Sequence, residues 1–76
     1  MYKETFQKNL KIARTRREFT QAEAAQELGI SRVNITNYET GRTEPDIETL
    51  GKIIDLYGIN PSWLLGTGID AKKGDD

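Results

Sequence analysis

The block of residues 21–40 restricts most strongly what this chain can fold into. It reads QAEAAQELGISRVNITNYET, with one glycine, Gly29, between two stretches of helical periodicity. Ala24, Ala25 and Leu28 recur on one face of a helix with 3.6 residues per turn, and the small side chain of Ala25 allows a second helix to cross closely. Gly29 stands where helices commonly end in a left-handed residue. The block therefore predicts two short helices joined by a tight turn.

Capping residues mark the ends of both helices. Thr20 and Glu23 have the T-x-x-E spacing of a capping box, in which each side chain bonds the other residue's backbone amide. Ser31 is the expected N-cap of the second helix, which runs to about Thr40 and stops at Gly41. Two capped helices at this spacing form a helix-turn-helix, the motif that places its second helix in the major groove of DNA.

The second helix of the motif has two distinct faces. At about 100° per residue, Ile35 and Tyr38 fall on the side that we expect to face the core. The other side carries Arg32, Val33, Thr36, Asn37 and Thr40. Arginine bonds guanine bidentately, asparagine bonds adenine, and valine or threonine methyl groups contact the methyl group of thymine. An ordinary solvated face is the alternative, but the surrounding motif favours DNA contact.

Three further helices are predicted outside the motif. The first covers about residues 3–17, with Phe6, Leu10, Ala13 and the stem of Arg17 on one stripe. The fourth helix follows the cap Asp46, and its apolar face consists of Ile47, Leu50, Ile53, Ile54 and Tyr57. The fifth helix is short: Asn60 supplies its cap, Pro61 is the N1 proline, and residues 63–65 form the helix, which Gly66 closes.

Composition favours one small all-α domain and excludes several functions. With 76 residues, 36% of them hydrophobic, we expect a compact five-helix domain at residues 1–66 and a frayed, charged tail at residues 67–76. Cysteine and histidine are both absent, which removes disulfides, the usual general base and the common zinc ligands. No apolar run reaches the roughly 18 residues of a membrane helix. We therefore expect a cytoplasmic protein that is not an enzyme and has no metal, cofactor, small-molecule ligand or membrane partner.

The charge distribution bears on the DNA interpretation. The net charge is −1, although DNA-binding domains are usually basic. Residues 1–42 carry eight basic and five acidic side chains, whereas residues 43–76 carry three and seven. Glu44, Asp46 and Glu48 would repel DNA if they pointed towards it. So few cations predict weak binding by one subunit, and we therefore expect a homodimer on two half-sites. Its candidate contact patch consists of Ile59, Trp63 and Leu64, with the core as the alternative place for the tryptophan.

Four stretches of the chain resemble one known family. They are LKIAR at 10–14, FTQAEAAQELGIS at 19–31, ITNYETGR at 35–42 and INPSWLLG at 59–66. The chain resembles the Cro and repressor type of helix-turn-helix domain, found in lambdoid phages and in XRE-like bacterial regulators. The resemblance implies a lambda-repressor-like fold and a transcriptional regulator, most often a repressor, that binds a palindromic operator in double-stranded DNA as a dimer. It also implies a bacterial or phage-encoded protein that is associated with the nucleoid when bound.

The resemblance also implies roles for individual residues. The expected base-contacting residues are Arg32, Val33, Thr36 and Asn37. The residues expected near the DNA phosphates are Arg14, Thr20, Gln21, Thr40 and Arg42. Arg14 and Glu39 resemble a structural pair that joins the first helix to the end of the recognition helix, the second helix of the motif. The alternative is an antitoxin-like or other protein-interaction module that retains this fold. Such a module has little reason to keep together the polar residues Arg32, Asn37, Gln21 and Arg42.

Overall fold

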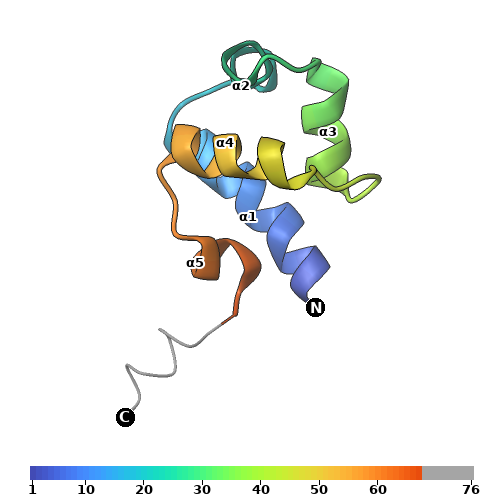
Figure 1. The fold of residues 1–76 in the computed structure, drawn as a ribbon, viewed down its shortest axis with the longest axis vertical. Helices are drawn as coiled ribbons and strands as arrows, with labels where there is room; N and C mark the ends of the chain where they lie inside the picture. The colour runs from blue at the N-terminus through green and yellow to red at the C-terminus, as the bar shows by residue number, and fades with distance from the viewer. Residues whose placement is uncertain (68–76) are drawn as a thin grey trace.

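Residues 1–67 are described by the computed structural model, and within them the chain forms five helices and no strand. The helices are α1 (Tyr2–Arg16), α2 (Gln21–Leu28), α3 (Arg32–Thr40), α4 (Ile47–Tyr57) and α5 (Pro61–Leu65). Figure 1 shows α3 along one side of the molecule and α4 passing in front of α1. The predicted all-α class is confirmed. The frayed tail predicted at 67–76 falls, apart from its first residue, outside the described residues.

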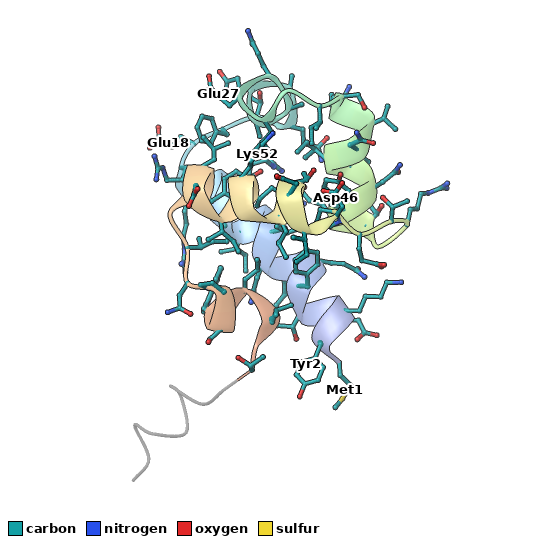
Figure 2. The ribbon with its side chains drawn as sticks, viewed as in Figure 1. Met1, Tyr2, Glu18, Glu27, Asp46 and Lys52 are labelled. Atoms are coloured by element: carbon teal, nitrogen blue, oxygen red, sulfur yellow. The ribbon has the colours of Figure 1, made fainter. Side chains whose placement is uncertain are left out.

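Polar caps start the helices where the sequence predicts them. The Thr20 hydroxyl accepts a hydrogen bond from the Glu23 amide at 3.0 Å, and the Glu23 carboxylate accepts one from the Thr20 amide at 2.8 Å. Ser31 and Asp46 each accept a hydrogen bond from the amide three residues further on, at 3.3 and 2.8 Å. Asp46 is labelled in Figure 2, at the start of α4. These bonds satisfy amides that have no partner within their own helix.

Gly29 closes α2 and turns the chain towards α3. Its φ of 71° and ψ of 29° lie in the left-handed region, and the next amide, that of Ile30, donates to the Ala25 carbonyl at 3.0 Å. No atom lies within 4 Å of the position that a Cβ would occupy, so the backbone conformation rather than space requires glycine. The turn from α1 to α2 uses a left-handed residue too, but it is Glu18, with a φ of 61°.

One hydrophobic core receives side chains from all five helices. Its buried members are Phe6, Leu10, Ala13, Ala24, Ala25, Leu28, Ile35, Tyr38, Ile53, Tyr57 and Leu64. The short side chains of Ala24 and Ala25, which are 0% and 3% exposed, allow α2 to approach its neighbours α3 and α4. On the other side of the core, α1 packs against α3 and α5. This packing leaves α3 held by two helices.

Two residues that the sequence places on apolar stripes do not reach the core. Ile47 is 82% exposed, and the residues on either side of it, Asp46 and Glu48, are exposed as well. The first turn of α4 therefore extends past the core, and the prediction for Ile47 is wrong. Arg17 is also exposed because α1 ends one residue before it.

A buried asparagine attaches α5 to α1. The Asn9 side-chain amide donates to the carbonyl oxygens of Trp63 and Leu64 at 2.8 and 3.4 Å. Leu64 is only 1% exposed, so it fills the core and does not belong to a surface patch for dimerisation. Trp63 is partly buried against the core, and the guanidinium carbon of Arg16 lies 5.4 Å from the centre of its ring.

The buried phenol of Tyr57 makes the fold less stable at alkaline pH. Burial raises the pKa of Tyr57 to about 12, above the value of roughly 10 expected in the unfolded chain. The neutral phenol therefore contributes stability fully below about pH 10, and this contribution is lost as the pH rises towards 12. Since phenylalanine does not ionise, we expect native protein to lose about 1 to 2 kcal/mol relative to Tyr57→Phe across this range, because solvent screens part of the effect.

Urea unfolding of both proteins between pH 9 and pH 12 measures this difference. Tyr2→Phe, at a tyrosine that is 64% exposed, is the control. Parallel stability curves for native protein and Tyr57→Phe would contradict the prediction.

Candidate nucleic-acid interface

Helix α3 has one buried face and one open face. Ile35 and Tyr38 are 2% and 9% exposed and hold the helix to the core. On the other face Val33 is 65% exposed, although it is apolar. The four predicted base-contacting residues all belong to the open part of α3, with Arg32 and Val33 exposed and Thr36 and Asn37 half-buried. The fold therefore presents the predicted set together on one helix.

A buried ion pair joins α1 to the last turn of α3. Arg14 Nε lies 2.7 Å from Glu39 Oε2, Arg14 Nη2 lies 3.1 Å from Glu39 Oε1, and the two side chains are 8% and 5% exposed. Arg14 Nη1 donates to the carbonyl oxygen of Phe19 at 2.8 Å. The hydrogen bond to Glu39 raises the pKa of Arg14 above its ordinary value, against the opposing effect of burial. The structure thus brings together the two residues that the sequence pairs.

The residues predicted near phosphates differ in their accessibility. Thr20, Thr40 and Arg42 are exposed, and Gln21 is half-buried. Arg14 is only 7% exposed, and each of its three guanidinium nitrogens donates to a protein oxygen. The geometry therefore favours its structural role, while its contact with a phosphate stays a prediction.

The side chain of Gln21 is held by two residues of α3. Its Nε2 donates to Glu39 Oε1 at 3.2 Å, and its Oε1 accepts from the Thr36 hydroxyl at 3.0 Å. The sequence predicts a glutamine donor near DNA but not these contacts, because 18 and 15 residues separate the partners along the chain. The position of Gln21 at the start of α2 is the one sequence signal, and it does not specify which residue of α3 it meets.

The acidic residues after α3 are partly neutralised within the fold. The carboxylate of Glu44 lies 3.2 Å from Lys3 Nζ. Asp46 caps α4, and the hydrogen bond from the Thr49 amide lowers the pKa of Asp46 below its usual value. Both carboxylates therefore already have positive partners, a lysine and the start of a helix.

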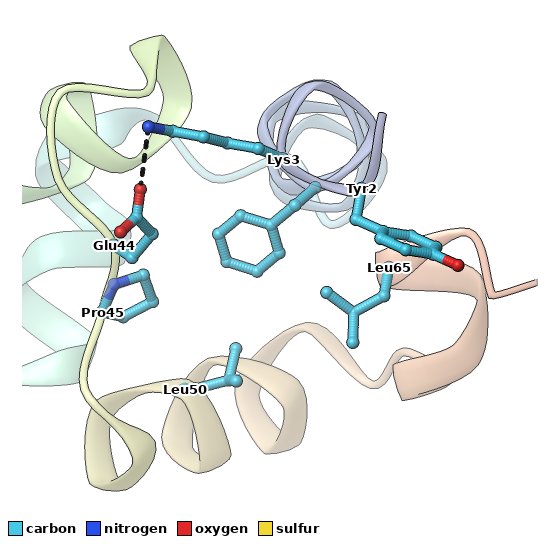
Figure 3. A pocket seen from close by; sticks show the side chains of 7 residues that line it. Tyr2, Lys3, Glu44, Pro45, Leu50 and Leu65 are labelled. Atoms are coloured by element: carbon cyan, nitrogen blue, oxygen red, sulfur yellow. Dashed lines mark ion pairs between the residues drawn. The ribbon is translucent and has the colours of Figure 1, made fainter.

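An apolar groove of about 370 Å³ lies apart from the open face of α3. Its lining residues are Tyr2, Lys3, Phe6, Glu44, Pro45, Leu50 and Leu65. Figure 3 shows the ion pair of Lys3 and Glu44 at one side of it. None of the predicted DNA-contacting residues lines this groove.

The described part of the chain has neither a metal-binding cluster nor a membrane-spanning helix. Among residues 1–67, no group of three or more histidine, cysteine or acidic side chains is arranged to hold a metal ion. No helix in the same range has the length and apolar character needed to cross a membrane.

Comparison with known proteins agrees with this geometry. A family model described as helix-turn-helix matches residues 10–64, which include α2, α3 and every buried core residue except Phe6. The chain therefore belongs to the XRE-type helix-turn-helix family.

Similar curated proteins occur in Bacillus subtilis (strain 168). The HTH-type transcriptional regulator ImmR is 41% identical over 68 residues, which cover 90% of this chain and 54% of ImmR. The SPbeta prophage-derived uncharacterized HTH-type transcriptional regulator YonR is 38% identical over 60 residues, covering 79% of this chain and 56% of YonR. This chain thus spans about half the length of the curated relatives that it matches. Among solved structures none matches the chain significantly.

Removing the carboxylate of Glu39 should destabilise the fold strongly. Glu39→Ala leaves the buried Arg14 guanidinium without its charge partner, which typically costs about 3 to 5 kcal/mol. Glu27→Ala is the matched control because Glu27 is exposed on α2 and belongs to no ion pair within residues 1–67 (Figure 2). Chemical unfolding of both variants measures the difference, and equal free energies of unfolding would exclude a stabilising pair.

Proposed function

We propose that the chain is a sequence-specific DNA-binding transcriptional regulator that places α3 in the major groove. The main observation in support is the open face of α3. Arg32 is exposed there beside Val33, which is 65% exposed, while Ile35 and Tyr38 anchor the opposite face. Such a face offers donors and a methyl group to base edges without disturbing the core. The names of the relatives, which are HTH-type transcriptional regulators, support the same function.

Contacts with the DNA backbone would fix how deeply α3 enters the groove. Thr20 and Gln21 stand at the start of α2, where free amides and the positive end of the helix dipole attract a phosphate. Arg42 is exposed just after the end of α3. In this proposal Thr20, Gln21, Thr40 and Arg42 position the domain, and the residues of the open face specify sequence.

We further propose that the regulator acts as a repressor and binds a palindromic operator as a homodimer. One domain supplies few cations, so a second domain on a second half-site would raise both affinity and specificity. Half-sites one helical turn apart, about 34 Å, would then be related by the two-fold axis of the dimer.

Selection of bound sites from random DNA, followed by gel-shift titration at two salt concentrations, tests this function. We expect an inverted repeat with half-sites about 10 base pairs apart. A selected site without symmetry would contradict the dimer. Failure to obtain any specific complex at low salt would contradict DNA regulation and favour the protein-interaction alternative.

Two arginine substitutions distinguish base contact from phosphate contact. Arg32→Ala should weaken binding to the selected site by about 1 to 3 kcal/mol and relax base preference at one position. Arg42→Ala should weaken binding to all sequences alike and reduce the salt dependence. Titration of the selected site and of a scrambled duplex measures both effects. If Arg32→Ala lowers both affinities equally, Arg32 does not contact a base.

A further inference from the structure

The hydrogen bonds around Gln21 have a fixed direction. Glu39 is held by Arg14, and its carboxylate accepts hydrogen bonds but donates none. The amide nitrogen of Gln21 must therefore face Glu39, because the reversed amide would place two acceptor oxygens against each other. With the nitrogen at 3.2 Å from Glu39 Oε1, the amide oxygen of Gln21 faces Thr36. The buried ion pair thus determines which atom of Gln21 the recognition helix meets.

This direction determines how the hydroxyl of Thr36 can bond. Among residues 1–67 its single hydrogen has two acceptors, Gln21 Oε1 at 3.0 Å and the Arg32 carbonyl oxygen at 3.3 Å. Whichever oxygen takes the hydrogen, none is left for DNA. Towards a partner outside the protein the Thr36 oxygen is therefore an acceptor only, and the side chain also carries a methyl group.

We propose that Thr36 is an acceptor-only specificity residue that selects an A·T pair through the N6 amino group of adenine. The inference rests on the proposed function, since it requires α3 in the major groove. Adenine N6 donates a hydrogen bond, and the paired thymine adds a methyl group that the Thr36 methyl can contact. Cytosine N4 also donates, but a G·C pair has no methyl group, and in place of the adenine N6 donor it presents guanine O6, an acceptor that would face the Thr36 oxygen. Gln21 and Glu39 are positioning residues that act through Thr36.

A base analogue tests the contact on the operator found by site selection. Each adenine of a half-site is replaced in turn by purine, which lacks the N6 amino group. At one position we expect the affinity of native protein to fall about threefold to tenfold, the effect of one lost hydrogen bond. Thr36→Val keeps the shape of the side chain without the oxygen, so its affinity should not change at that position.

Thr40→Val is the matched control for this experiment. The hydroxyl of Thr40 also lies on α3 and donates to a backbone carbonyl, that of Thr36, at 2.8 Å. Whatever its overall affinity, Thr40→Val should lose affinity as native protein does when that adenine is replaced by purine. If Thr36→Val retains that effect at every adenine, the inference is overturned while the proposed function stands. If native protein forms no specific complex, both are overturned.

A second variant tests the positioning role of Gln21. Gln21→Met keeps an unbranched side chain but removes the nearer of the two acceptors of the Thr36 hydroxyl. The Arg32 carbonyl oxygen remains at 3.3 Å, a long bond that the hydroxyl can exchange for one donated to DNA. We expect affinity for all sequences to fall, and the preference for A·T over G·C at the Thr36 position to fall by about a further threefold. A thermal melt shows that the variant is folded. An unchanged base preference in the folded variant would show that Gln21 does not control Thr36.

Discussion

The buried ion pair of Arg14 and Glu39 is the constraint on which the arrangement of the helices around α3 depends. Two charges that are 8% and 5% exposed have lost most of their hydration, so each must be satisfied by the other and by nearby polar groups. The Phe19 carbonyl accepts a third bond from the guanidinium, which places the turn between α1 and α2 as well. A displacement of α1 relative to α3 would stretch the two hydrogen bonds between Arg14 and Glu39. The pair therefore specifies geometry in addition to any stability that it contributes.

The starts of the helices can be predicted from the sequence because each depends on residues that are close together in the chain. The starts of α2, α3 and α4 follow from Thr20, Ser31 and Asp46, because a cap and its amide partner lie within three residues of each other. Periodicity is weaker evidence, because it does not show where the core ends. Ile47 fits the stripe of α4, but it lies in an exposed first turn and is itself 82% exposed. Glu18 adopts a left-handed conformation that is usually left to glycine, so no composition signal marks that turn.

Some features of the candidate site likewise follow from the local sequence, whereas others depend on tertiary packing. The open face of α3 follows from the angular positions of Arg32, Val33 and Asn37 on a helix. The bonds of Gln21 to Thr36 and Glu39 depend on how α2 and α3 cross, which no short stretch of sequence encodes. The buried amide of Asn9, which attaches α5 to α1, has the same origin. Sequence thus predicts which side chains are available, and tertiary packing determines which hydrogen bonds remain open to a partner.

The exposure of Val33 has a consequence for how this domain can change over evolutionary time. A side chain that is 65% exposed contributes little to folding, so substitution there carries a small penalty in the unfolding equilibrium. The same holds for Arg32, which is exposed and forms no ion pair among residues 1–67. Thr36 differs, because its hydroxyl is bonded to Gln21 and through it to the buried pair. As far as folding is concerned, α3 therefore combines two positions that can vary at little cost with one whose hydroxyl is bonded to its neighbours.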